Sequence, residues 1–177
     1  MEASSAVMRL RLATTADIAD VMAIVQKVVP QMQASGNFQW DESYPCAADF
    51  ETDVEKSQLW LAVDEKSTVV GFSALTTTQP IEYKDCGYDI LIPAIVPHRM
   101  AVDPSCRRAG LGQLFLSKAE ELASAGGLGL VRIDTNASNH AMQKVILKAG
   151  YAFRGEIFLT VLAGKLPFCC YEKTITR

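Results

Sequence analysis

The chain has 177 residues, of which 49% are hydrophobic and 21% charged, with a formal net charge of −3 at pH 7. This length and apolar content suffice for one hydrophobic core, so we expect a single domain over residues 1–177, of which residues 1–7 form a flexible start. Charges of both signs are spread along the chain, which argues against nucleic acid as the default partner.

No apolar run reaches the length needed to cross a bilayer, and the N-terminus lacks a basic stretch followed by an apolar one. Neither a membrane span nor a secretory signal is therefore expected. The five cysteines form no Cys-x-x-Cys pair, and their odd number indicates reduced thiols rather than a disulfide framework or a zinc site. We expect a cytoplasmic protein without a bound metal.

The first half of the chain alternates between strand and helix patterns. Thr14 offers a helix cap, and the apolar residues from Ile18 to Val28 follow spacings of three and four. A turn at 64–67 separates two apolar runs and predicts a hairpin. The expected elements in this half are a strand at 8–12, a helix through 18–28, a helix at 47–56, and strands at 59–63 and 69–77.

The apolar run at 90–102 predicts a strand that is interrupted. It carries Pro93 and Pro97, and proline cannot donate a hydrogen bond to the ladder of a sheet. We therefore expect a bulge in this strand, or a point where its pairing ends. The polar segment at 79–89 before it predicts a loop over the sheet.

A loop and a helix follow this strand, and Gly110 and Gly112 stand where the helix begins. The first turn of a helix has N–H groups without intrahelical partners and lies at the positive end of the dipole. With Arg107 and Arg108 nearby, this pattern predicts a phosphate-binding loop. The spacing is neither that of a P-loop nor that of a dinucleotide fingerprint, and an ordinary glycine-rich turn is the plain alternative.

The second half completes a mixed α/β pattern, β-α-α-β-β-β-α-β-α-β-β, in which we find no internal repeat or linker. Its glycines at 126–127 and 150 end two helices. The elements expected after the glycine-rich loop are a helix to 125, a strand at 128–133, a helix at 141–149, and strands at 151–162 and 168–175.

The spacing Arg-x-x-Gly-x-Gly, formed by Arg107, Gly110 and Gly112, resembles the pyrophosphate-binding loop of the GNAT superfamily of N-acetyltransferases. His98-Arg99-Met100-Ala101-Val102 and Tyr171-Glu172-Lys173 are similar to the cofactor strand and the final strand of small bacterial-type members. The resemblance implies a single-domain α/β fold, with a mostly antiparallel sheet flanked by helices. It also implies a splayed central strand pair that receives the pantetheine arm of acetyl-coenzyme A.

The resemblance also implies which residues hold the cofactor. Arg107 and Arg108, with the backbone N–H groups of Ala109, Gly110, Leu111 and Gly112, would bind the diphosphate. The backbone of Met100, Ala101 and Val102 would hold the pantetheine amides and supply an oxyanion donor. Asn139 is expected to cap its helix, either alone or while also contacting the pantetheine arm.

Acetyl transfer to an amine requires the neutral amine, so a general base helps. His98 is the first candidate, because its ordinary pKa is ~6.5 and strand alternation would place it on one face with Met100 and Val102. A structural histidine bonded to backbone beside the bulge is the alternative. Where relatives often have a tyrosine as general acid, this chain has Ile146, which cannot donate a proton.

The segment at 31–45 mixes aromatic residues with carboxylates. Phe38, Trp40 and Tyr44 are candidates for the acceptor pocket, and Asp41 would suit a cationic acceptor. A small hydrophobic cluster is the plainer interpretation of the same aromatic residues.

These patterns predict an acetyl-coenzyme A dependent N-acetyltransferase that acts on a small primary amine by direct attack in a ternary complex. Two alternatives stay open: a coenzyme A-binding sensor that has lost catalysis, motivated by Ile146, and a protein or peptide acetyltransferase. The sequence does not identify the acceptor amine. It also leaves open whether a longer acyl-coenzyme A is the donor and whether the protein forms a homodimer.

Overall fold

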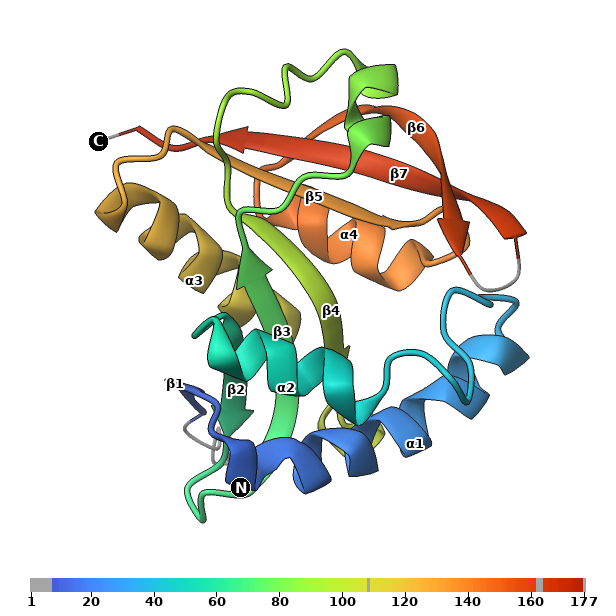
Figure 1. Ribbon diagram of the computed structural model, residues 1–177, viewed down its shortest axis with the longest axis vertical. Helices are drawn as coiled ribbons and strands as arrows, with labels where there is room; N and C mark the ends of the chain where they lie inside the picture. The colour runs from blue at the N-terminus through green and yellow to red at the C-terminus, as the bar shows by residue number, and fades with distance from the viewer. Residues whose placement is uncertain (1–7, 108, 162–163, 177) are drawn as a thin grey trace, which may run out of the picture.

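The structure is a computed structural model that describes residues 8–107, 109–161 and 164–176 (Figure 1). Its strands form two antiparallel sheets that meet at one edge. The first sheet has the order β1-β2-β3-β4, and the second has the order β5-β7-β6. The strands of the first sheet are β1 (Arg9–Leu12), β2 (Leu59–Val63), β3 (Val69–Thr76) and β4 (Val96–Val102). Those of the second are β5 (Leu130–Asn136), β6 (Ala152–Val161) and β7 (Gly164–Thr174).

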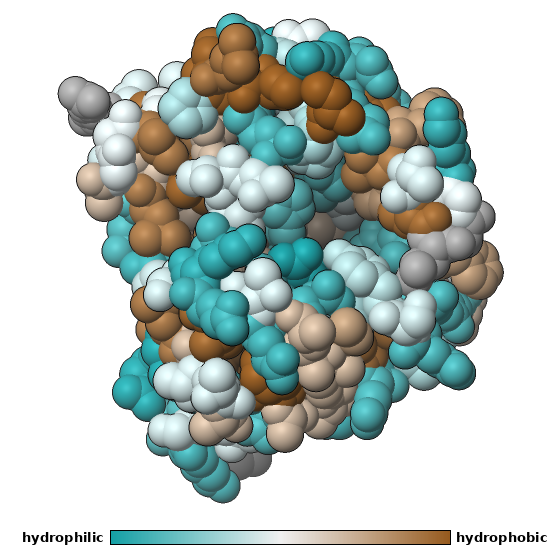
Figure 2. Space-filling view, in the orientation of Figure 1, coloured by the Kyte–Doolittle hydropathy of each residue, from teal (hydrophilic) through white to brown (hydrophobic). Residues whose placement is uncertain are grey.

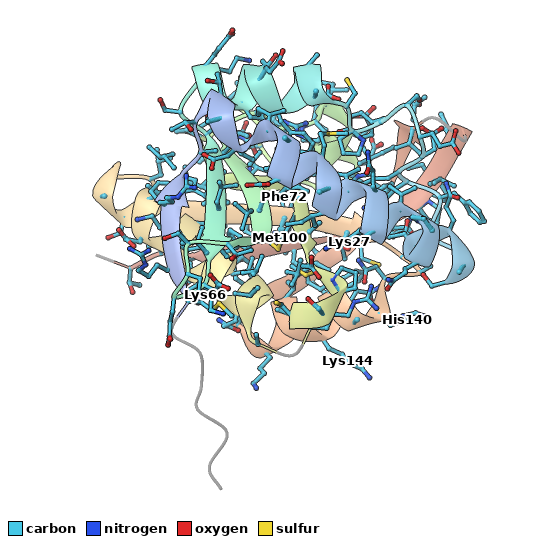
Figure 3. The ribbon with its side chains drawn as sticks, turned by 90° about the horizontal axis from the view of Figure 1, so that it is seen from below. Lys27, Lys66, Phe72, Met100, His140 and Lys144 are labelled. Atoms are coloured by element: carbon cyan, nitrogen blue, oxygen red, sulfur yellow. The ribbon has the colours of Figure 1, made fainter. Side chains whose placement is uncertain are left out.

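Helices cover both faces of the strands, as Figure 3 shows with the strands between two helical layers. The helices are α1 (Ile18–Ala34), α2 (Ala47–Glu55), α3 (Leu111–Ala125) and α4 (His140–Lys148). Three short 3-10 helices lie between them: η1 (Thr15–Asp17), η2 (Ile81–Cys86) and η3 (Pro104–Cys106). This mixed α/β architecture confirms the predicted fold class. None of the helices in the described ranges is long and apolar enough to cross a membrane.

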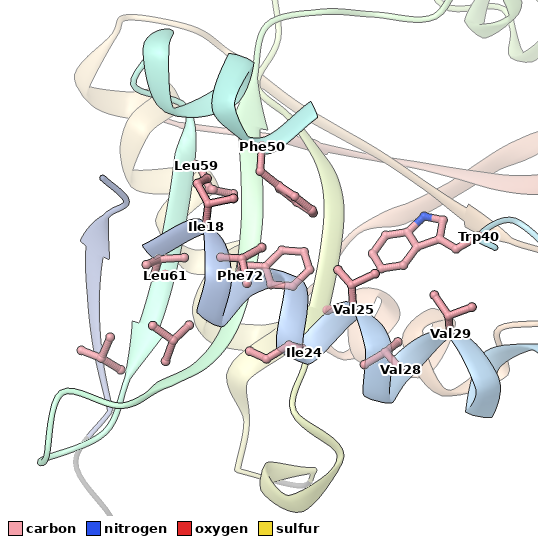
Figure 4. Packing of buried hydrophobic residues seen from close by; sticks show 14 residues of the cluster. Ile18, Ile24, Val25, Val28, Val29, Trp40, Phe50, Leu59, Leu61 and Phe72 are labelled. Atoms are coloured by element: carbon pink, nitrogen blue, oxygen red, sulfur yellow. The ribbon is translucent and has the colours of Figure 1, made fainter. Parts of the chain in front are cut away.

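The largest hydrophobic cluster lies between the first sheet and the layer of α1 and α2 (Figure 4). Phe72 of β3 is fully buried at its centre, with Phe50 of α2 edge-on at 5.1 Å and Trp40 stacked at 6.4 Å between ring centroids. Truncating such a side chain to alanine costs about 3–5 kcal/mol. Every residue of β3 is buried, because helices pack on both faces of this strand.

The segment predicted as a loop at 79–89 contains η2 and is fixed to the second sheet. Arg132 of β5 donates to Glu172 at 2.8 Å and to Gln79 at 2.6 Å, and its guanidinium lies over the ring of Tyr88. Gln79 in turn donates from Nε2 to the carbonyls of Ile90 and Ile92.

The strand that follows this segment begins at Val96 rather than at residue 90. The carbonyls of Ile90 and Ile92 bind a side chain and so do not join a ladder. Pro93 removes a backbone donor in the same stretch.

Candidate active site

The two sheets join at a single point in the described part of the chain and then separate. Ile95 forms an isolated parallel bridge with Val131, where Ile95 N donates to Leu130 O at 3.1 Å and Arg132 N donates to Ile95 O at 2.9 Å. From Val96 onward, β4 diverges from β5, as Figure 1 shows. The edge of β4 that faces β5 therefore presents backbone N–H and C=O groups to the gap.

A bulge in β4 lies inside this gap. His98 pairs with Ala74 and Ala101 pairs with Phe72, so two residues, Arg99 and Met100, stand opposite Ser73 alone. Arg99 has a φ of +47°, which is rare for a residue other than glycine. Its guanidinium donates to both carboxylate oxygens of Asp53 on α2, at 2.6 and 2.9 Å, and this ion pair holds the bulge in place.

The bulge corrects one prediction about His98. Ala74 and Phe72 lie on the α1/α2 face of β3, so their partners His98 and Ala101 lie on that face too. Met100 and Val102 instead pack with Leu111 and Phe115 of α3. The shared face expected from strand alternation is wrong, because the extra residue reverses the alternation after His98.

His98 borders a polar cleft of about 320 Å³ beside α2. Its Nε2 lies 2.9 Å from the carbonyl oxygen of Thr78, which can only accept, so Nε2 carries the proton. In the neutral ring, Nδ1 then has the basic lone pair. Figure 2 shows this face of the molecule, hollowed between the hydrophilic surface over α2 and the upper half. The cleft is lined by Asp49, Thr52, Asp53, Lys56, Gln58, Thr78, His98 and Arg99.

Asp134 of β5 and Tyr83 of η2 form a polar pair on the other side of the gap. The phenol of Tyr83, fully buried, donates to Asp134 Oδ2 at 2.7 Å. Burial raises the pKa of the Asp134 carboxyl, while the charge of His98 and the Tyr83 hydrogen bond act to lower it. Sequence reasoning assigned no role to either residue. The available signal was a carboxylate directly after the apolar run that ends at Ile133.

The loop after β4 is fixed by Asp103, which is buried. Its Oδ1 accepts from the backbone N and the hydroxyl of Ser105, at 2.9 and 2.7 Å, and its Oδ2 lies 2.7 Å from Nζ of Lys27 on α1. The hydrogen bond from Lys27, followed by those from Ser105, lowers the pKa of Asp103 to about 2. The carboxylate therefore stays ionised and orders the start of the loop.

The loop ends at α3 as the sequence predicted. Gly110 has a φ of +74°, and a Cβ built on it would meet nothing within 4 Å, so the space in front of it is open. The N–H groups of the first turn, from Leu111 to Gln113, lack intrahelical partners. Arg107 is exposed beside them, whereas Arg108 lies outside the described residues. These features fit a diphosphate group, whose charge suits a helix N-terminus.

Gly112 has a different role from Gly110, because it lies against another helix. A Cβ at this position would come within 3.3 Å of Val145 Cγ1 on α4. The glycine thus lets α3 and α4 approach each other. Ala109 and Leu111, which flank Gly110, belong to the loop and to the start of the helix.

The predicted helix cap is present on α4. Asn139 accepts from the backbone N of Met142 at 3.2 Å, and its contact with the pantetheine arm stays a prediction. Ile146 on the same helix is fully buried among residues of α3 and β5. The position of the usual tyrosine therefore contributes only to the core.

The aromatic residues expected at the acceptor pocket separate in the structure. Trp40 is 4% exposed and stacks on Phe72, so it is a core residue, in line with the plainer interpretation. Tyr44 is partly buried, and its hydroxyl accepts from Arg99 at 3.4 Å. Asp41 accepts from the backbone and hydroxyl of Ser43, which lowers its pKa and makes it a turn residue. Phe38 is 50% exposed.

Comparison with known families decides what this arrangement is. The model of the acetyltransferase (GNAT) family matches residues 26–151, which include the bulged strand, the glycine-rich loop and both helices behind it. The chain belongs to the GNAT acetyltransferase family. Members of this family are acyltransferases, and the GNAT fold uses acetyl-coenzyme A.

Solved structures share the whole GNAT fold with this chain. A GNAT family acetyltransferase from Streptococcus agalactiae 2603 is 23% identical, with a TM-score of 0.79 and 96% of each chain covered. One from Listeria monocytogenes 4b F2365 is 19% identical, with a TM-score of 0.74 and 98% of each chain covered. The protein yncA from Salmonella typhimurium, solved with its cofactor acetyl-CoA, is 13% identical, with a TM-score of 0.66, and 96% of this chain and 95% of that chain are covered. A comparison with curated proteins finds no match.

Proposed function

We propose that this GNAT member transfers the acetyl group of acetyl-coenzyme A to a primary amine of a small molecule. The proposal depends mainly on one observation: the strand β4 borders both the glycine-rich loop proposed for the cofactor and the polar cleft proposed for the acceptor. Its bulged end leads into the glycine-rich loop, and His98 borders the polar cleft. When bound, acetyl-coenzyme A supplies an activated thioester in the gap between β4 and β5.

The size and lining of the cleft support a small acceptor. Its volume of about 320 Å³ lies in the range of small-molecule pockets. Asp49 and Asp53 of α2 line it together with Lys56 and Arg99, so the formal charges of the cleft cancel. The Asp134 carboxyl across the gap is the group proposed to attract an alkylammonium ion. The acceptor would enter from the α2 side, while the cofactor would occupy the α3 side.

His98 is proposed as the base for the acceptor. An alkylammonium with a pKa of ~10.4 is neutral in only about one part in a few thousand at pH 7, so removing its proton accelerates attack. The Nε2–H bond to Thr78 O fixes the ring and leaves Nδ1 to take that proton, directly or through water. The backbone N–H groups near Met100 and Ala101 are proposed to stabilise the developing oxyanion.

Direct attack by the amine is favoured over a covalent enzyme intermediate. Burial raises the pKa of the Cys86 and Cys170 thiols, both close to Asp134, so these thiols stay protonated and are poor nucleophiles. No protein acid is needed for the leaving group, because a thiol of pKa ~8.5 leaves readily as a thiolate.

A coenzyme A-binding sensor is the second candidate, and the burial of Ile146 favours it. One experiment separates the two: free thiol is followed after mixing the protein with acetyl-coenzyme A and a panel of amines, polyamines, amino acids and peptides. Release that depends on a small amine supports the proposal. Release with peptides alone indicates a peptide acetyltransferase, and binding without acceptor-dependent release indicates a sensor.

A further inference from the structure

His98 and Asp134 occupy equivalent positions on the two strands that separate. The bridge between Ile95 and Val131 is parallel, and each of the two polar residues lies three positions beyond its own strand's bridging residue. Ile95 and Val131 both belong to the cluster packed on α3 and α4. An odd number of steps reverses the face, so His98 and Asp134 both lie on the opposite face, across the gap from each other.

The Asp134 carboxylate is oriented from behind by Tyr83. The Tyr83 ring is fully buried and packs edge-on against Tyr88 at 5.3 Å, so its hydroxyl has a fixed position. Because a carboxylate only accepts, this hydroxyl donates to Oδ2. Beyond Tyr83, the described structure gives Asp134 no hydrogen bond from another side chain.

The charged and titratable groups around the two residues are mostly paired or neutral. Tyr83 and Cys86 of η2 and Cys170 of β7 face Asp134, and burial raises the pKa of all three, so they are neutral near pH 7. Two cations on this side, Arg132 of β5 and Arg154 of β6, lie over the Tyr88 ring and both approach Glu172, at 2.8 and 4.0 Å. On the side of His98, the cleft holds Asp49, Asp53, Lys56 and Arg99, whose formal charges cancel. The charge of His98 and the hydrogen bond from Tyr83 oppose the effect of burial on the pKa of Asp134, and in its ionised form Asp134 is the group that attracts a cation to the gap.

We infer that Asp134, held by Tyr83, is a positioning residue that draws the ammonium form of the acceptor into the gap and stabilises the imidazolium of His98. This inference rests on the proposed function. In the step concerned, an N–H bond of the ammonium breaks and its proton binds Nδ1 of His98. The electron pair stays on the amine nitrogen, which then attacks. Asp134 keeps its own charge throughout, and no further reactant is required.

The variant Asp134→Asn tests the inference, because asparagine keeps an acceptor for Tyr83 and removes the charge. The chain has two histidines, His98 and His140, so an NMR titration of the free protein resolves both, and a His140→Gln variant assigns them. We expect the His98 ring to titrate at lower pH in Asp134→Asn than in wild type, since an opposite charge nearby favours the charged form. The substitution should leave the titration of His140, exposed on α4, unchanged. An unchanged titration of His98 in folded Asp134→Asn overturns the inference.

Turnover provides a second readout that a purely structural role would not change. With an amine that wild type accepts, kcat/KM of Asp134→Asn should fall about 10-fold to 100-fold. In a plot of kcat/KM against pH, the acidic limb should move to lower pH together with the titration of His98. An unshifted limb overturns the inference. If wild type itself shows no acceptor-dependent release, the proposed function fails, and the NMR titration still decides on Asp134.

Two variants that each remove one tyrosine hydroxyl form a matched pair of test and control. Tyr83→Phe removes the hydrogen bond to Asp134 and should lower kcat/KM, even if Asp134→Asn does not fold. Tyr88 belongs to the same cluster, and its buried hydroxyl has no hydrogen-bond partner among the described residues. Tyr88→Phe should therefore leave kcat/KM unchanged. Equal effects of the two variants would show that only packing is involved.

Discussion

The guanidinium of Arg99 is held by both carboxylate oxygens of Asp53, at 2.6 and 2.9 Å, across 46 residues of sequence. This ion pair joins α2 to the bulge of β4, and it fixes a backbone conformation that an arginine rarely adopts. Because the bulge sets the direction of His98 on one side and of Met100 on the other, both halves of the site depend on this pair.

Breaking this pair should therefore destabilise the fold and weaken the binding of both coenzyme A and the acceptor. The side chains of Asp53 and Arg99 are 4% and 20% exposed, so Asp53→Asn leaves a cation buried and should destabilise the fold by about 3 kcal/mol. Glu121→Ala, which removes an exposed pair with Lys118, should cost less than about 1 kcal/mol. Urea denaturation measures the difference, and equal losses would contradict the structural role of the pair.

Gly110→Val should weaken coenzyme A binding at least 10-fold. The side chain would fill the open space in front of the first turn of α3, where the diphosphate is proposed to bind. Gly36→Val is the matched control, because Gly36 also has a positive φ, +82°, and open space around it. Both variants should lose a similar 1–3 kcal/mol or so through backbone strain. Calorimetry that finds equal affinity in the two folded variants would refute the assignment of the loop.

His98→Ala should lower turnover by roughly 10²–10⁴-fold with little change in coenzyme A affinity. The loss should shrink at high pH, where the free amine is abundant without a base. The measurement is kcat against pH for both proteins. If His98→Ala keeps the pH dependence of wild type, His98 is not the base, and a structural histidine bonded to Thr78 is the better description.

Acid should weaken the fold partly through Asp103. Its pKa is lowered to about 2 in the folded protein, against ~3.9 in an unfolded chain. The carboxylate therefore stabilises the fold above about pH 4, and this contribution of about 2 kcal/mol is lost as the pH falls toward 2. Urea denaturation from pH 5 to pH 2 should show a smaller decline for Asp103→Asn than for wild type. Parallel declines would contradict the contribution of Asp103.

The sequence by itself determined the glycine-rich loop and the fold class. The loop is contiguous, from Arg107 to Gly112, and its chemistry comes from local backbone: a helix start, a positive φ at Gly110 and unpaired first-turn N–H groups. Periodicity likewise located the helices and most strands, since each element buries one face that its own residues define. The two prolines also indicated an irregular strand before the loop.

The tertiary structure alone decided which groups meet across the gap. Strand alternation placed His98 with Met100, yet the bulge reverses their faces, and the bulge is stabilised by a carboxylate 46 residues away. The pairing of Asp134 with Tyr83 gave no local signal, because it joins residues 51 apart in sequence. Trp40 is a core residue because it stacks on Phe72 and packs with residues of other elements. Local patterns report a residue's own backbone and face, whereas a catalytic partner is defined by packing between distant segments.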